Sequence, residues 1–441
     1  MAHRNFDNIA LDRRALLRSG ALLGGGALFA GSPFAALAKP AGGDGAAAWP
    51  NVTAMVEDYV AQRRVANMVA TLGWGQKDAV TIARGPLTIG QAAMAGPDSL
   101  YRIYSMTKPV TGMAAMILID EGKLGLDQPI AELLPAFSRM MVQKTPDGSL
   151  TDLVPAERPI TVRHLLTHTA GLGYNIVQKG PIKKLYEDQG LIPGQVSRIQ
   201  LPGFGPALPV KGLAAFADRL AKAPLVYQPG TRWSYSVSLD LLGRVIEVAG
   251  KQPFDHFLHE RIFEPCRMSS TWFRVPESEV GRLTTNYGIV NGAPVPIDPA
   301  RASIYLDEPA FPFGGAGLVS SPRDYDRFLA MLAGLGALEG RRVMSERAVR
   351  VGTSNLLPAG VSTEGTFAAG SGFGAGGRSS DGNYGWGGAA GTVAFANVNS
   401  GLRGNLMTQY MPSEAWPVHS AFPAAVLKDV AAMISARKAA A

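Results

Sequence analysis

The chain has 441 residues, of which 46% are hydrophobic, so it can bury a large core and is long enough for two or three domain-sized units. Its formal net charge is +7, but the basic residues are spread out with no block of five or more, which argues against a nucleic-acid partner. The single cysteine, Cys266, excludes an intrachain disulfide bond, and we expect it to pack as a small apolar side chain.

The N-terminal segment 1–38 has the composition of an export signal. It carries a pair of arginines, Arg13 and Arg14, then a weakly apolar Gly/Ala/Leu stretch, and it ends in an Ala-Leu-Ala cleavage sequence. A twin-arginine signal predicts export in the folded state, hence a periplasmic or secreted protein with no stable membrane association after cleavage. The alternative is an uncleaved membrane anchor, which the abundant glycine and the Ser32-Pro33 break disfavour.

The next part of the chain predicts a helix followed by two strands. After a flexible leader at 39–50, apolar residues at helical spacing predict a helix over 51–64. Apolar runs at 68–75 and 79–85 predict adjacent strands joined by a polar turn. The segment 174–210 is rich in Gly, Pro and Lys, and we expect a long surface excursion near a pocket. Further helices are predicted at 106–121, 160–168, 238–250, 253–264, 321–336 and 422–439.

Strand signals return near the C-terminus. The runs 392–398 and 402–410, joined by Asn-Ser-Gly, predict a hairpin. Because strands lie near both ends of the chain and helices fill the middle, we predict an α/β fold of the α+β type. Its sheet domain is expected to combine 51–105 with 310–438, and a mainly helical domain, 106–309, is expected to be inserted between them.

The stretch "YSMTKPVTG" places Ser105 three residues before Lys108 at the start of a predicted helix. This spacing puts both side chains on one face, one turn apart. A neutral amine can take the proton of a serine hydroxyl, and a helix N-terminus favours developing negative charge. The pattern alone is weak, because Ser435 and Lys438 match it too, in a helix with no loop chemistry around it. We interpret that second match as chance.

Two further motifs have both a structural and a functional interpretation. Tyr235 lies in a Pro-Gly-led loop before a predicted helix, where a buried core tyrosine is the simpler reading. Trp386, Gly387 and Gly388 lead into a predicted strand. Glycines there allow a substrate to lie against the strand edge and expose a backbone N–H, although a plain glycine-rich turn is the alternative.

Taken together and in this order, the motifs resemble the serine β-lactamase and penicillin-binding protein superfamily. Within it the chain is most similar to the family VIII carboxylesterases, which share the class C β-lactamase fold. The resemblance covers roughly 50–435. It implies an antiparallel sheet flanked by helices and built from both chain ends, plus the inserted helical domain. The segments that carry it are "RIYSMTKPVTGMAAMILIDEGKLGLDQPI", "ITVRHLLTHTAGLGY", "PGTRWSYSVSLDLLGRVIE", "GGAGLVSSPRDYDRFLAML" and "GWGGAAGT…LMTQYMPS".

The resemblance implies roles for individual residues. The family's nucleophile falls on Ser105, its lysine on Lys108 and the tyrosine of its second motif on Tyr235. The backbone N–H groups of Ser105 and Ala389 would form the oxyanion hole. Either Lys108 or Tyr235 could accept the proton of the nucleophile, and the sequence leaves that choice open.

Two departures from the β-lactamase pattern bear on the substrate. The second motif is Tyr-Ser-Val, so Val237 stands where β-lactamases have an asparagine that can bond a substrate amide. The third motif, Trp386-Gly387-Gly388, replaces Lys-Thr-Gly and so lacks the cation that would pair with a β-lactam carboxylate. Both changes suit a neutral, apolar ester, and we expect these residues and Tyr174 to contact it.

Other polar and aromatic residues favour structural roles. His168 could be a base, but lysine and tyrosine already fill that role, and Asp127 is expected at a turn or helix cap. The sequence does not decide whether Trp233 lines the pocket or belongs to the core. His256 and His259 lie three residues apart without the further ligands that a metal site needs, so we expect neither a metal nor an organic cofactor.

The resemblance therefore implies a secreted serine hydrolase that cleaves short-chain carboxylic esters, a small-molecule substrate, through an acyl-serine. Three alternatives stay open. The first is a β-lactamase or a hydrolase of D-peptides or amide oligomers, and the second is an acyltransferase. The third is a non-catalytic binding module on the same fold.

Overall fold

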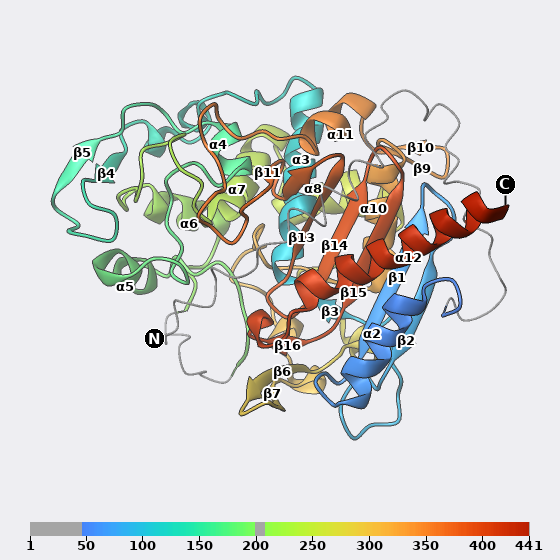
Figure 1. Cartoon of the computed structure of the whole chain (residues 1–441). Helices are drawn as coiled ribbons and strands as arrows, with labels where there is room; N and C mark the ends of the chain where they lie inside the picture. Colours follow the sequence, from blue (N-terminus) through green and yellow to red (C-terminus); the bar gives the residue numbers. More distant parts are fainter. Residues whose placement is uncertain (1–45, 199–207, 441) are drawn as a thin grey trace.

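The structure, a computed structural model, describes residues 46–198 and 208–440. Its largest element is a seven-stranded antiparallel sheet in the order β11-β12-β13-β14-β15-β1-β2 (Figure 1). Strand β1 from the N-terminal part pairs with β15 from the C-terminal part, with Val69 opposite Met407. The predicted sheet built from both chain ends is confirmed. Its strands are β1 (Met68–Trp74), β2 (Val80–Arg84), β11 (Gly372–Phe373), β12 (Arg378–Ser380), β13 (Asn383–Gly387), β14 (Val393–Asn397) and β15 (Leu402–Met407).

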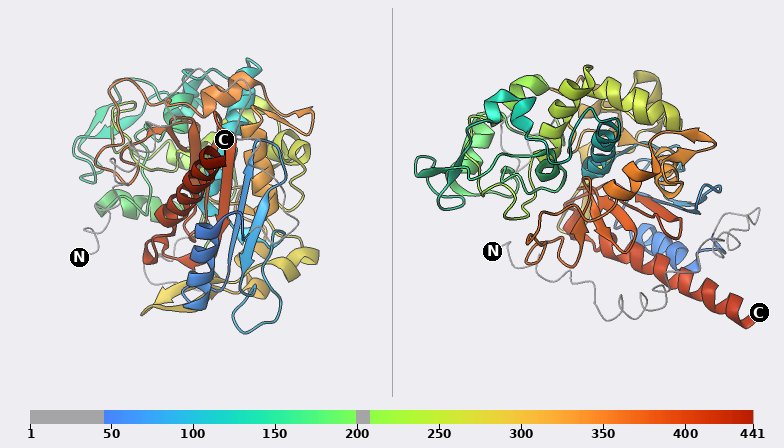
Figure 2. Two further views of the ribbon diagram at one scale, coloured as in Figure 1. Left: turned by 45° about the vertical axis from the view of Figure 1, so that its right-hand side comes forward. Right: turned by 90° about the horizontal axis from the view of Figure 1, so that it is seen from above.

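Helices cover both faces of this sheet. The terminal helices α2 (Pro50–Ala61) and α12 (Val418–Ala440) pack side by side on one face (Figures 1 and 2). Helix α10 (Pro322–Ala333) packs on β1, β14 and β15, and Ser321 caps it by accepting a hydrogen bond from the Asp324 N–H. The predicted export signal and the leader up to residue 45 lie outside the described residues. Among the helices in 46–198 and 208–440, none is both long enough and apolar enough to cross a membrane.

Helix α3 (Thr107–Asp120) joins the sheet to the helical part of the chain. Its residues from Thr107 to Leu118 are all buried, and it packs against α7 and α11 as well as β13. Gly112 allows a further close approach, to the segment between β11 and β12, because a Cβ there would lie 1.9 Å from the backbone oxygen of Ala375. The helix predicted over 106–121 is therefore buried on every side along most of its length.

In the region between α3 and α10 helices outnumber strands, and Figure 2 shows these helices gathered on one side of the sheet. It also contains two groups of strands whose pairing was not predicted: β4 and β5 pair with each other, and β6 and β7 form a sheet with β16 from the C-terminal part. The boundaries of the two predicted domains stay a prediction. The helices of this region are α4 (Val162–Leu166), α5 (Gly180–Asp188), α6 (Leu213–Leu220), α7 (Ser238–Gly250), α8 (Phe254–Leu258), a π-helical turn (His259–Phe263) and α9 (Glu264–Cys266), and α11 (Glu346–Gly352) follows α10. The remaining strands are β3 (Tyr101–Arg102), β4 (Met141–Gln143), β5 (Leu153–Pro155), β6 (Asn286–Val290), β7 (Ala293–Asp298), β8 (Val319–Ser320), β9 (Ala337–Leu338), β10 (Arg341–Arg342) and β16 (Tyr410–Met411).

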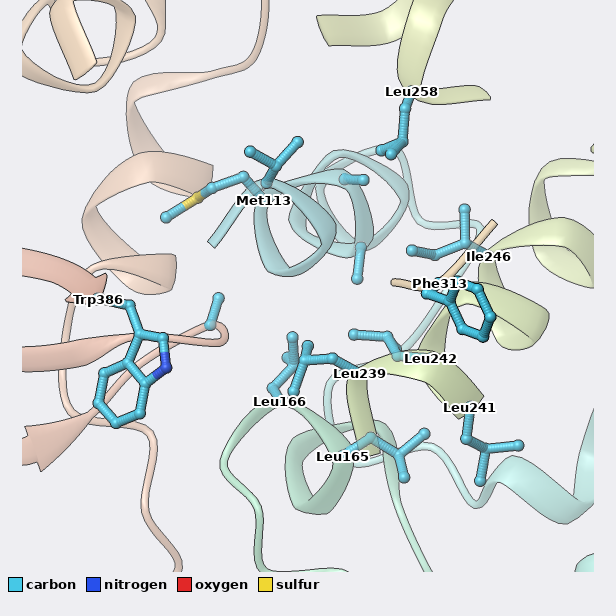
Figure 3. Packing of buried hydrophobic residues seen from close by; sticks show 14 of the residues in the cluster. Met113, Leu165, Leu166, Leu239, Leu241, Leu242, Ile246, Leu258, Phe313 and Trp386 are labelled. Atoms are coloured by element: carbon cyan, nitrogen blue, oxygen red, sulfur yellow. The ribbon is translucent and has the colours of Figure 1, made fainter. Parts of the chain in front are cut away.

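The main hydrophobic core lies where α3 meets α4 and α7. Figure 3 shows Met113 of α3, Leu166 of α4 and Leu239 of α7 in this cluster, with Trp386 of β13 at its border. These side chains are buried, and the first three are fully so. Dense packing of this kind resists local displacement, so it holds the start of α3, the end of β13 and the start of α7 in a constant arrangement.

A buried ion pair ties β3 to β7 directly before the start of α3. Arg102 is 0% exposed and its Nε donates to Asp298 Oδ2 at 2.7 Å. Further guanidinium hydrogen bonds go to Ser303 Oγ and to the backbone oxygens of Thr284 and Asp298. Breaking a buried pair from one side leaves the other charge without compensation.

We therefore expect Asp298→Ala to lower the free energy of unfolding by about 3–5 kcal/mol. The measurement is the midpoint of a chemical denaturation curve, followed by far-UV circular dichroism. The matched control is Asp127→Ala, which removes an exposed ion pair with Arg163 (2.6 Å) and is expected to cost about 1 kcal/mol or less. Equal shifts for the two variants would contradict the argument from burial.

Candidate active site

Ser105 lies in a 3-10 turn (Tyr104–Met106) that runs directly into α3. Tyr104, immediately before it, has φ of +42°, in the left-handed region that is strained for a residue with a side chain. Its hydroxyl accepts a hydrogen bond from Asn286 Nδ2 (3.1 Å) and its ring packs edge-on against Tyr305. This anchored turn leaves Ser105 half-buried, whereas the helix that follows is enclosed.

Lys108, in the first turn of α3, is 0% exposed and faces the serine. Its Nζ donates to Ser105 Oγ at 3.2 Å and to the backbone oxygen of Gly315 at 2.7 Å. The same Nζ lies 4.5 Å from the centre of the Tyr235 ring. The i, i+3 spacing expected from the sequence thus does bring amine and hydroxyl into contact.

Tyr235 reaches the serine from the loop before α7. Its hydroxyl donates to Ser105 Oγ at 2.7 Å, and Trp386 Nε1 donates to the tyrosine oxygen at 3.3 Å. Ser105 Oγ is therefore bonded by the amine of Lys108 and the phenol of Tyr235 together. The indole N–H, which can only donate, stabilises negative charge on the phenolic oxygen.

The end of β13 lies against the turn that carries the serine. A Cβ on Gly388 would lie 2.4 Å from the backbone oxygen of Ile103, so glycine is needed for this approach. Gly388 N–H bonds the Thr392 oxygen at 2.7 Å and closes a tight turn that holds Ala389 half-buried. Gly387, before it, packs against His419.

Aromatic rings surround the three polar groups. Tyr174 lies 5.4 Å and Trp233 6.2 Å from the Tyr235 ring, measured between ring centres, and both are nearly fully buried. Phe367 is 36% exposed, yet it packs edge-on against Tyr235 and Trp233 at 5.4 Å. Phe367 was not predicted, because its only signal in the sequence is its place in a glycine-rich loop. Burial raises the pKa of Tyr174 well above its usual value.

Two residues from the sequence analysis do not face this site. Val237 is 0% exposed and its N–H bonds the Gly173 oxygen, so its side chain offers no surface to a substrate. His168 packs against Tyr235 with ring centres 4.8 Å apart, and its Nδ1 bonds Ser236 Oγ at 3.0 Å. Burial, helped by the Lys108 charge, holds the pKa of His168 well below its usual value, so the ring is neutral and packs as structure.

The remaining candidates have structural partners. Asp127 sits in a turn and pairs with Arg163 through both carboxylate oxygens, which lowers its pKa. Cys266 is buried, and burial raises the pKa of its thiol to about 12. Within the part of the chain that the structure describes, no group of three or more His, Cys, Asp or Glu residues could hold a metal ion. Ser435 and Lys438 are exposed on α12.

A comparison with known protein families agrees with this arrangement of a serine, a buried lysine, a tyrosine and a glycine-rich strand end. Residues 52–427 match the model of the beta-lactamase family. The chain belongs to the beta-lactamase family. The resemblance drawn from the sequence motifs is thereby confirmed, as is the fold class.

This chain is also similar to individual proteins, over different shares of its length. It is 36% identical over 260 residues to Protein Rv1367c of Mycobacterium tuberculosis and 32% identical over 245 residues to Esterase EstB of Burkholderia gladioli. These matches cover 59% and 53% of this chain, and the chain spans only 60% and 56% of those relatives. Among solved structures it is similar to EstCE1, a hydrolase with promiscuous acyltransferase activity. That match has a TM-score of 0.68 and 25% identity, and it covers 87% of this chain and 98% of EstCE1.

The geometry predicts that Ser105 is the reactive serine of this family member. A fluorophosphonate probe should form a covalent adduct on Ser105, because its hydroxyl contacts both a buried amine and a phenol. Mass spectrometry of the digested protein locates the adduct. Ser105→Ala should abolish labelling and Ser435→Ala should leave it intact. An adduct that persists in Ser105→Ala would place the nucleophile elsewhere.

Proposed function

We propose that the chain is a serine carboxylesterase of the family VIII type that hydrolyses short-chain carboxylic esters through an acyl-serine intermediate. The observation that carries this proposal is the convergence of Lys108 Nζ and Tyr235 OH on Ser105 Oγ, at 3.2 and 2.7 Å. It is supported by the similarity to Esterase EstB and to the hydrolase EstCE1.

In the proposed reaction Ser105 Oγ attacks the ester carbonyl carbon as its proton passes to the pair formed by Lys108 and Tyr235. These two groups are in contact, so the proton belongs to the pair rather than to either residue. The backbone N–H groups of Ser105 and Ala389 stabilise the negative oxygen, and each such donor is typically worth about 3 kcal/mol. Collapse of the intermediate expels the alcohol, which takes the proton through Tyr235. Water then attacks the acyl-serine and regenerates the hydroxyl by the same groups in reverse.

The surroundings of the serine support a neutral, apolar ester as substrate. Trp386 and Phe367 place apolar rings next to Tyr235, where Trp386 stands in the position of the β-lactamase cation. A ring offers dispersion contacts to an acyl or alkyl group but no ion pair to a carboxylate. Val237 is buried and brings no side-chain amide into the site that could bond a substrate amide. An esterase is therefore the first candidate, and a β-lactamase or amide hydrolase is the second.

Acyl transfer to an alcohol is a further outcome of the same chemistry, since an alcohol can replace water at the acyl-serine. It is favoured by one observation, the similarity of this chain to EstCE1, a hydrolase with promiscuous acyltransferase activity. Adding an acceptor alcohol during ester turnover and identifying a new ester by mass spectrometry tests it. Hydrolysis products alone, at high alcohol concentration, would exclude it.

We also propose that the protein is exported through its twin-arginine segment. The support is the sequence of residues 1–38, with Arg13 and Arg14 before an apolar stretch. Fractionation of the producing cell should recover a form that lacks this segment outside the cytoplasm. An unprocessed chain that accumulates in the cytoplasmic fraction would overturn the proposal.

The first test compares p-nitrophenyl butyrate with nitrocefin on the purified protein. We expect kcat/KM for the ester to exceed that for nitrocefin by at least about 100-fold, since each lost polar recognition contact costs on the order of 1–3 kcal/mol. Ser105→Ala should lose both activities and serves as the control for background hydrolysis. Faster turnover of nitrocefin would identify a lactamase, and full esterase activity in Ser105→Ala would remove the residue assignment.

A further inference from the structure

Asp240 of α7 is a buried carboxyl group that the proposed reaction does not use. It follows Tyr235 by five residues and is 1% exposed. A carboxyl group without water around it needs hydrogen-bond donors or a nearby cation. Asp240 has both: the Gly315 N–H donates to it, and the charge of Lys108 acts on it. Gly315 in turn contacts Lys108.

One glycine links Asp240 to Lys108. Asp240 Oδ1 accepts the backbone N–H of Gly315 at 2.8 Å, and the backbone oxygen of Gly315 accepts Lys108 Nζ at 2.7 Å. The neighbouring Gly314 oxygen accepts Thr111 Oγ1 of α3 at 2.7 Å. The Gly314-Gly315 segment is therefore held between α7 and α3, and its position sets where Lys108 Nζ rests against Ser105.

The two glycines are needed because Asp240 and its helix lie so close. A Cβ on Gly315 would lie 2.5 Å from Asp240 Oδ2, and one on Gly314 would lie 2.5 Å from the Leu239 oxygen. A side chain at either position would push the segment away from the carboxyl group and from Lys108. Steric crowding by Asp240 and its helix thus explains why the segment "FPFGGAGL" has two glycines at these positions.

The charged and titratable groups that interact with Asp240 are few. Lys108 approaches from α3, and Tyr174 from the loop after α4, with Tyr235 next to both of them. Burial raises the pKa of Asp240 to about 7, while the charge of Lys108 acts to lower it. The carboxyl group therefore changes charge near neutral pH, beside the amine that must receive a proton.

We propose that Asp240 is a positioning residue of the proposed hydrolase: through Gly315 it holds Lys108 against Ser105, and its carboxylate charge acts on the amine that shares the proton of the serine. The inference rests on the proposed function only in naming the reaction. The sign follows from electrostatics, because an anion near an amine favours the protonated amine. Removing the charge should therefore move the pH dependence of the reaction to lower pH.

The test replaces Asp240 by asparagine in the full chain. Asp240→Asn keeps an oxygen that can accept the Gly315 N–H but removes the charge, so the fold and the contact are preserved. We expect the acidic limb of the pH profile of kcat/KM for p-nitrophenyl butyrate to move to lower pH by on the order of one unit, with KM nearly unchanged. Asp240→Ala, which also loses the hydrogen bond, should lower kcat at least about 10-fold at every pH.

The control is Asp324→Asn, a buried carboxyl group in α10 that accepts the Ser270 N–H at 2.6 Å and lies outside the site. Its pH profile should match the wild type. An unshifted acidic limb in Asp240→Asn would overturn the proposal and leave Asp240 as a purely structural residue.

The rate of fluorophosphonate labelling at Ser105, measured over the same pH range, separates this inference from the proposed function. If Asp240→Asn shifts the acidic limb of the labelling profile but the protein hydrolyses no ester, only the proposed esterase function is refuted. Ester hydrolysis with an unmoved limb would refute the role of Asp240 alone. Should Asp240→Asn fail to fold, the effect of Lys108 on Asp240 is measured instead, by infrared titration of the buried carboxyl band of Asp240. Lys108→Met should then move that titration to higher pH, and an unchanged titration would overturn the proposal.

Discussion

A lysine amine enclosed in the protein interior is the constraint on which the site depends. Lys108 Nζ has no water around it, so its hydrogen bonds must come from the protein, and they come from Gly315 and Ser105. Each of these partners belongs to a different segment. The start of α3, the segment before β8 and the turn that carries the serine must therefore be placed together for the amine to be tolerated at all.

The packing around α3 meets this requirement. The helix is buried along nearly its whole length, and its close approach to Ala375 depends on Gly112. The core shown in Figure 3 connects it to α4, α7 and β13. Because a close-packed interior moves little, small shifts at the polar site are resisted by many apolar contacts. The same helix thus contributes to both stability and chemistry, and the strained Tyr104 is held at its start.

The aromatic shell gives the polar groups their electrostatic character. Trp386, Phe367 and Trp233 exclude water from Tyr235, and the neutral His168 packs behind it without adding charge. In such surroundings a charge interacts more strongly with its neighbours than it would in water. A titrating group such as Asp240 can therefore influence Lys108 through one intervening glycine.

The sequence by itself determined the elements with strong local patterns and the motifs with a set spacing. Helix α3 and the strand pairs near both ends follow from hydrophobic periodicity, and Ser105 and Lys108 meet because one helical turn brings them onto one face. The short strands β6, β7 and β16 were missed, because pairing between residues 286–298 and 410–411 is not a local property. The tertiary structure alone decided that Gly315 joins Asp240 to Lys108 and that Phe367 covers Tyr235. Contacts between segments so far apart in the chain depend on how helices and strands pack, and no spacing in the sequence records that packing.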